Sequence, residues 1–392
     1  MPKKDQSNKP QSSVAQISMS TQNVVVDRIG VNGIGLSDLE AIRLILSGNS
    51  IVDWERANFR TMAEVDQYLK VLHFDWNNRT DRRRIERVFQ DAVQFLETHL
   101  DMPCVQEVKD IEDIRNLFLW ASDYDVVSPR QTASCVVLKL MHVLQHLDSA
   151  ELRHQAPIAE EKLLAHAEQQ ILSYKEAMKS AVPGVVEFYG SRKTRDSIVS
   201  KLLAKKEDVA STVFDKLRFR IITKTKDDLL PLMVWLQRKA FPYNFVIPGQ
   251  SHNNLMPFRK MVAAHGLDRP QSNGIMEDDV VESPNEFSST TYRVINFIVD
   301  VPVRIDDVIA HSVDEGLGKV VFVMAEFQIV DQATAVTNEE GDNSHLCYKE
   351  RQRARVQERL QYGQHIQHLV NVQISTAGSN LSDSSSDSDQ SP

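Results

Sequence analysis

The stretch KVVFVMAEFQIVD, residues 319–331, decides the fold class of this chain. It is rich in β-branched and aromatic residues, which is typical of a strand. Because successive side chains of a strand point to opposite faces, Glu326 and Gln328 share a face with Phe322 and Met324. A carboxylate in an apolar strand is costly unless it is paired or bound to a metal. Glu326 is therefore a candidate functional residue; the alternative is an edge-strand glutamate that faces water.

Two further runs, 217–225 and 291–305, have the same strand-like composition, and a helical pattern at 227–241 lies between them. The part of the chain with strand-like composition begins at Pro183 and Gly184. We expect residues 183–370 to form a mixed β-sheet flanked by helices. The polar stretch 248–289 is expected to be a functional or disordered loop.

The first half of the chain has a different pattern, with apolar residues that recur every three and four positions from 36 to 180. This predicts an all-α N-terminal domain and an α+β protein overall. Residues 1–22 and 376–392 are dominated by Ser, Gln, Asn, Asp and Lys, so we expect a disordered arm and a disordered tail.

The bulk composition narrows the class of protein. The chain has 392 residues, a formal net charge of -9 and three cysteines that are far apart in the sequence. This acidic balance argues against a protein that coats nucleic acid, and the cysteine spacing argues against a zinc site or a disulfide framework. No apolar run is long enough to span a bilayer and the first residues lack a signal pattern, so we expect a cytoplasmic protein with no membrane partner.

A basic segment, EFYGSRKTRDSIVSKLLAKK, begins at Glu187. Lys193, Ser197 and Lys201 are spaced by four and would share one face of a helix, with Arg192 adding charge. Such a set suits a polyphosphate, because Arg grips oxygens in pairs and Lys supplies a point charge. The alternative is a solvated basic helix.

A second candidate group surrounds Asp215, directly before the strand-like run in VFDKLRFRIIT. Arg218 and Arg220 alternate there with apolar residues. A carboxylate at the mouth of a strand is a usual magnesium ligand, and it is equally usual as a cap or a salt-bridge partner.

Together, five segments resemble the nucleotide pyrophosphotransferase domain of the RelA/SpoT-type alarmone synthetases. That family reads approximately GRxKxxxSIxxK, FDxRxxR, NGYxSxH, E[VI]QIRT and HWxYK. This chain has YGSRKTRDSIVSK, FDKLRFR, TTYRVIN, EFQIVD and HLCYKE in the same order, from Phe188 to Glu350. The resemblance implies a divergent member with that family's nucleotidyltransferase-like sheet, and it leaves the helical half unmatched.

The resemblance implies a magnesium-dependent transfer of pyrophosphate from ATP to the 3′-hydroxyl of a purine nucleotide. Asp215 and Glu326 are implied as catalytic residues and Mg²⁺ ligands that converge on one ion. A salt bridge from Arg218 or Arg220 at that position would argue against an enzyme. The implied ligands of the ATP phosphates are Arg192, Lys193, Ser197, Lys201 and Arg220, and those of the acceptor are Tyr292, Asn296, Gln328 and His345.

The chain departs from the family pattern mainly on the acceptor side. Asn296 stands at the histidine position, Val330 and Asp331 replace the Arg and Thr, and Leu346 replaces the Trp. Two alternatives therefore stay open: a non-catalytic nucleotide-binding regulatory protein of the same fold, and a toxin-like enzyme that pyrophosphorylates RNA ends. The basic segment 349–359 could contact RNA, although a solvated helix is the commoner outcome.

A histidine pair, His142 and His146, lies four residues apart in the helical half, close to Asp148. Such a pair can hold a metal ion. The alternative, which we favour, is two histidines on a helix surface.

Removing residues 1–22 and 376–392 should leave the melting temperature nearly unchanged, because neither segment has enough apolar residues to dock. Thermal unfolding of the truncated and full chains checks this. A large drop in melting temperature would show that one of the segments packs on the body of the protein.

Overall fold

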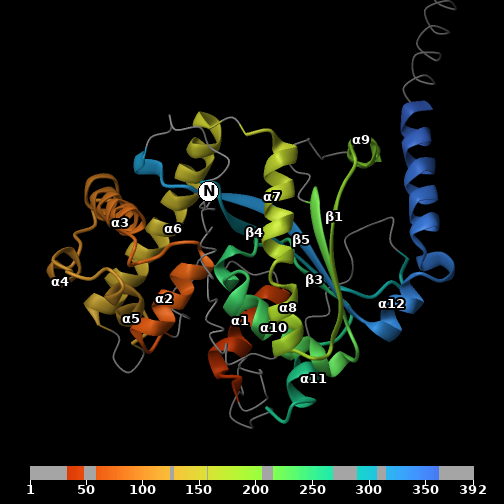
Figure 1. The fold of residues 1–392 in the computed structure, drawn as a ribbon, viewed down its shortest axis with the longest axis horizontal. Coiled ribbons are helices and arrows are strands. Elements are labelled where there is room, and N and C mark those ends of the chain that lie inside the picture. Colours follow the sequence, from red (N-terminus) through yellow and green to blue (C-terminus); the bar gives the residue numbers. More distant parts are fainter. Residues whose placement is uncertain are drawn as a thin grey trace, which may run out of the picture.

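The computed structural model describes residues 33–47, 59–123, 128–156, 158–204, 215–267, 289–306 and 315–361 (Figure 1). Within these ranges the chain is helical before Val185 and forms a five-stranded sheet with helices after it. The expected α+β class and mixed sheet are confirmed. The predicted disordered segments 1–22 and 376–392 lie outside the described residues. The limits of separate domains at 36–180 and 183–370 stay predictions.

The helices of the first half have the amphipathic pattern that the sequence predicts. Asn78 caps α3 by accepting hydrogen bonds from the backbone N–H groups of Thr80 and Asp81, and Ser128 caps α6 ahead of a proline. Their order is α1 (Leu36–Ser47), α2 (Met62–Val71), α3 (Arg79–His99), α4 (Gln106–Lys109), α5 (Asn116–Ala121), α6 (Pro129–Gln155), α7 (Glu160–Leu172) and α8 (Lys175–Ala181). In the described ranges no helix has the length and apolar character required to cross a bilayer.

The sheet has the strand order β1-β2-β5-β4-β3. β2 and β5 run parallel, whereas the other neighbours are antiparallel. The strands are β1 (Val185–Arg192), β2 (Leu217–Thr223), β3 (His252–Asn253), β4 (Ile295–Arg304) and β5 (Val320–Asp331). The stretch that decides the fold class is thus the central strand, β5.

A row of aromatic rings covers one face of the sheet. Phe219 on β2 and Phe297 on β4 both stack on Phe327 of β5, at 5.2 and 5.7 Å between ring centroids, and Phe188 of β1 extends the row. All four are fully buried or nearly so. Because side chains alternate along a strand, the neighbours of these phenylalanines lie on the opposite face. That face carries the polar residues discussed below.

The remaining helices surround the sheet. They are α9 (Arg195–Ala204), α10 (Leu229–Lys239), α11 (Phe258–Ala263), α12 (Gln332–Asn338) and a helix over 345–361. Figure 1 shows α9 near the end of β1 and α12 at the opposite side from α3 to α5. Strand β1 was not predicted, and the stretch 248–289, expected to be a loop, contains β3 and α11.

The helical half and the sheet share one hydrophobic core. The main cluster of buried side chains runs from α1 to β5, and α1 contacts α10, β3 and β4. Ion pairs reinforce this packing: Arg304 of β4 binds Asp81 of α3 at 2.9 Å, and Arg238 of α10 binds Asp38 of α1. The helices are therefore a structural support of the sheet.

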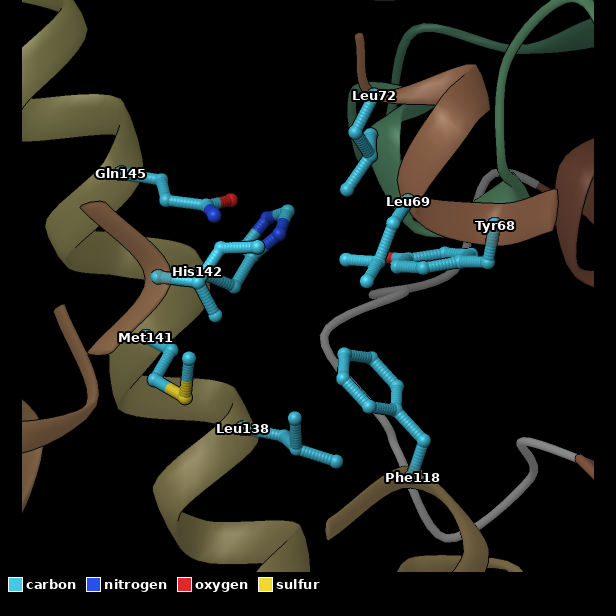
Figure 2. A pocket seen from close by; sticks show the side chains of 9 residues that line it. Tyr68, Leu69, Leu72, Phe118, Leu138, Met141, His142 and Gln145 are labelled. Carbon is cyan, nitrogen blue, oxygen red and sulfur yellow. The ribbon is translucent and has the colours of Figure 1, made fainter. Parts of the chain in front are cut away.

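Of the histidine pair on α6, His142 is buried and His146 is half-buried, so the favoured alternative of two surface histidines is wrong for His142. His142 lines a small cavity of about 20 Å³, enough for about one water molecule, and Figure 2 shows it facing Leu69 and Leu72 of the α2 segment. His146 stacks on Phe322, 4.3 Å between centroids. Among the described residues no three His, Cys, Asp or Glu side chains gather as metal ligands.

Burial lowers the pKa of His142 to about 3, helped by repulsion from His146. Unfolding returns the group to roughly 6.5, so the unfolded chain binds more protons between these values and stability falls as the pH drops. His142→Leu should therefore reduce the loss of unfolding free energy between pH 7 and pH 5 by about 2 kcal/mol. Urea unfolding of both proteins at the two pH values checks this. Equal losses in the two proteins would contradict it.

Candidate functional site

Polar side chains gather on the face of the sheet opposite the phenylalanines. Arg218 of β2 lies in register with Glu326 of β5, Arg220 lies in register with Gln328, and Asn296 of β4 is the partner of Gln328 on the other side. Glu326 is 5% exposed and belongs to the central strand. The alternative of an edge-strand glutamate that faces water is therefore wrong.

Asp215 lies just before β2 and collects three cations. Lys201 of α9 donates to its Oδ1 at 2.8 Å, Lys193 donates to its Oδ2, and Nη2 of Arg218 approaches Oδ2 at 3.3 Å. The carboxylate is 6% exposed. A buried carboxylate needs such partners, because an unpaired charge at this depth is strongly unfavourable.

Lys193 and Lys201 both contact Asp215, but not because they share one face of a helix. Lys193 lies in the short link between β1 and α9, whereas Lys201 lies on the helix itself. The prediction that Lys193 lies on the same helix as Ser197 and Lys201 is therefore wrong. Ser197 is bonded locally to Thr194, whose Oγ1 donates to its Oγ at 3.1 Å.

Glu326 is held by donors from three strands. Nε of Arg218 donates to Oε2, and the side-chain amides of Asn296 and Gln328 donate to Oε1 at 2.8 and 3.1 Å. The guanidinium of Arg218 therefore contacts both buried carboxylates. Asp215 and Glu326 contact the same guanidinium, and their convergence on one metal ion stays a prediction.

Electrostatics at this cluster favour the charged carboxylate of Asp215. Burial opposes ionisation, but attraction to Lys193 and Lys201 holds the pKa of Asp215 well below its usual range. Burial lowers the pKa of Lys193, only partly offset by Asp215. For Arg218, burial is outweighed by attraction to Glu326, which raises the pKa of the guanidinium. The three cations exceed the two anions by one positive charge.

Two other predicted site residues, Arg220 and Tyr292, lie around this cluster without joining it. Arg220 reaches Glu339 at 3.3 Å, and its Nε is buried without a hydrogen-bond partner. Tyr292 packs against a small apolar cluster that includes Ile222 and Val330, outside the main core. Burial raises the pKa of Tyr292, and the charges of Arg220 and Arg218 act on it in the opposite direction.

The structure places two predicted ligands away from the cluster. Arg192 pairs with Glu168 of α7 at 3.0 Å, on the apolar side of the sheet. His345 begins the helix over 345–361, is exposed, and stacks on Tyr348 at 6.4 Å between centroids. Asp331, at the family's Thr position, caps α12 by accepting a hydrogen bond from the backbone N–H of Thr334.

Two features of the site were not assigned from the sequence. From the sequence, Arg218 is expected only as a group that could occupy the metal position. Its alternation with the apolar Phe219 indicates that it lies on the polar face, where it is in register with Glu326. His252 of β3, in register with Asn296, has both ring nitrogens buried without a partner, and Oδ1 of Asn296 is also unpartnered. A histidine in a two-residue strand gives no signal in sequence.

A divalent cation does not fit between the carboxylates as they stand. Every oxygen of Asp215 and Glu326 accepts a hydrogen bond or ion pair from a protein donor. Mg²⁺ requires oxygen ligands at close range in near-octahedral geometry. An ion that bound both carboxylates would need the position between them, and the guanidinium of Arg218 occupies it.

Three solved structures are among those similar to this chain. They are small alarmone synthetase 1 from Bacillus subtilis bound to its product pppGpp (13% identity, 53% of this chain and 93% of that chain, TM-score 0.32), small alarmone synthetase 2 from Bacillus subtilis (16%, 56% and 97%, 0.30) and a GTP pyrophosphokinase family protein from Streptococcus pneumoniae (14%, 55% and 97%, 0.27). No family model and no curated protein matches the chain.

Asp215→Asn should lower the free energy of unfolding by about 3 kcal/mol, because it leaves three partly buried cations with one fewer anion. Urea unfolding measures the loss. The matched control is Glu339→Gln, which neutralises the exposed partner of Arg220 and should cost about 0.5 kcal/mol or less. Equal effects of the two variants would contradict the importance of the buried cluster.

Proposed function

We propose that this chain binds a purine nucleoside polyphosphate at the Asp215–Glu326 cluster without catalysing pyrophosphate transfer. The observation that carries the proposal is the convergence of Lys193, Lys201 and Arg218 on two buried carboxylates, with one positive charge in excess. An anionic ligand is attracted to such an excess. The three cations come from three elements that the fold holds in place.

Phosphate oxygens match the donors that this face offers. Lysine ammonium groups and guanidinium groups make short, charge-assisted hydrogen bonds to phosphate. Arg220 adds a buried Nε that has no hydrogen-bond partner. Lys193, Lys201 and Arg218 each retain partial exposure, so part of each cationic side chain is accessible.

Tyr292 favours a nucleotide over a simple inorganic polyphosphate. Its ring packs on one side against a small apolar cluster next to the polar face, and it lies within the electrostatic reach of Arg218 and Arg220. A base stacked on an aromatic ring gains roughly 1–3 kcal/mol. The phosphates would then extend toward the cations, and the base would lie on the tyrosine.

The same contacts argue against catalysis. A general base must accept a proton from the attacking hydroxyl, and a group with a strongly lowered pKa is a weak base. The lysines hold the pKa of Asp215 far down, and both oxygens of Glu326 already accept hydrogen bonds. Transfer of this type also depends on metal ions that neutralise the developing charge.

A second function is the Mg²⁺-dependent transfer of pyrophosphate from ATP to a purine nucleotide 3′-hydroxyl. One observation favours it: Asp215 and Glu326, more than a hundred residues apart in the sequence, contact the same guanidinium group. If Arg218 moved away, the two carboxylates could bind one ion. Here Asp215 and Glu326 would hold the metal, and Lys193 and Lys201 would bind ATP phosphates.

Turnover separates the two functions. The full chain, incubated with γ-labelled ATP, Mg²⁺ and GDP or GTP as acceptors, should release no labelled nucleotide product beyond a no-protein blank. Formation of labelled product that is lost in Glu326→Gln, with the variant still folded by circular dichroism, would establish the enzyme and overturn the proposal.

Binding tests the proposal directly. Calorimetric titration with ATP, GTP and pppGpp should show saturable binding to the wild-type chain. Lys193→Ala and Lys201→Ala should each weaken it about tenfold or more, since a charge-assisted hydrogen bond contributes roughly 1.5–3 kcal/mol. Lys216→Ala is the matched control, because Lys216 is next to Asp215 in the chain but pairs with Glu160. No binding, or equal losses in all three variants, would contradict the proposal.

A further inference from the structure

We propose that the guanidinium of Arg218 takes the place of a divalent cation between Asp215 and Glu326, so that polyphosphate binding at this site needs no metal. The inference rests on the proposed nucleotide binding for its ligand. Its geometric basis, a guanidinium that covers a latent pair of metal ligands, is independent of any nucleotide.

The position of Arg218 is fixed by the pairing of β2 with β5. Arg218 and Glu326 are partners in the parallel register, and neighbouring strands lie about 4.8 Å apart. Phe219, the next residue, is fully buried and stacked on Phe327. A shift of the strand that moved the guanidinium away would therefore also break the aromatic row on the other face.

The guanidinium also has the right charge and reach for this role. Its Nε binds Oε2 of Glu326 and its Nη2 approaches Oδ2 of Asp215 at 3.3 Å, so one planar group bridges two carboxylates as a metal ion would. An arginine is always charged in proteins. Mg²⁺ is exchanged with solvent, whereas this cation is part of the chain.

The remaining ligand atoms show what Arg218 covers. Two buried carboxylates at close range repel each other unless a cation lies between them. Without Arg218, Oε2 of Glu326 would lose its hydrogen-bond donor and Oδ2 of Asp215 would keep Lys193 alone. The buried Oδ1 of Asn296 has no partner among the described residues. Carboxylate and amide oxygens are ligands of hard divalent cations. Removing Arg218 should therefore create a metal site.

Manganese is the probe for this latent site, because the electron paramagnetic resonance signal of free Mn²⁺ decreases when the ion binds protein. The wild-type chain should leave the signal unchanged. Arg218→Ala should bind Mn²⁺ at least tenfold more tightly than the wild type, and the added substitution Glu326→Gln should abolish that gain. Lys216→Ala, which removes a cation next to Asp215 in the chain that pairs with Glu160, is the matched control and should behave as the wild type.

Three outcomes overturn the inference: Mn²⁺ binding by the wild type that Glu326→Gln removes, no binding by a folded Arg218→Ala, or binding that survives in the double variant. None depends on nucleotide, so the proposed function can stand or fall separately.

If Arg218→Ala fails to fold, the wild-type chain alone still decides. Calorimetric titration with ATP should give the same affinity, within about threefold, in EDTA and in Mg²⁺. A gain of tenfold or more on adding Mg²⁺ would show that the site requires a metal and would overturn the inference. Absence of binding of ATP, GTP and pppGpp under both conditions would refute the nucleotide-binding function, and with it the metal-independent binding inferred here.

Discussion

The parallel pairing of β2 with β5 is the constraint on which the site depends. It sets Phe219 beside Phe327 on one face and Arg218 beside Glu326 on the other. The apolar pair fixes the register through the core, and the register then brings a guanidinium to a buried carboxylate. Side chains alternate between the two faces of a strand. A slip of one residue would therefore turn the apolar side chains toward the site and the polar side chains toward the core.

Much of this arrangement could be predicted from the sequence. The alternation in 319–331 places Glu326 opposite Phe327, and the pattern in 217–223 does the same for Arg218 and Phe219. Local periodicity therefore predicts the faces, the α+β class and the importance of Glu326. It cannot predict that Lys193, between β1 and α9, and Lys201, on α9, both donate hydrogen bonds to Asp215, because those contacts depend on how the elements pack.

The errors have physical causes of the same kind. Arg192 follows the strand period and lies toward α7, where Glu168 pairs with it, so its nearness to Lys193 in sequence is misleading. His142 resembles a surface residue in the sequence because α6 is long and mixed in composition, yet it is buried against Phe245; His146 is half-buried and stacks on Phe322 of β5. The two-residue strand β3 is too short for a periodic signal, and it pairs with β4 through two residues.

The continuous core from α1 to β5 limits how the protein could respond to a signal. Arg304 and Arg238 tie β4 and α10 to α3 and α1, and the apolar contacts are unbroken between them. A rigid rotation of the helical half would have to separate these contacts at the cost of exposing core side chains. A ligand or modification that altered the helices would therefore act on the sheet through small shifts of packed side chains, and not through a hinge motion between two rigid bodies.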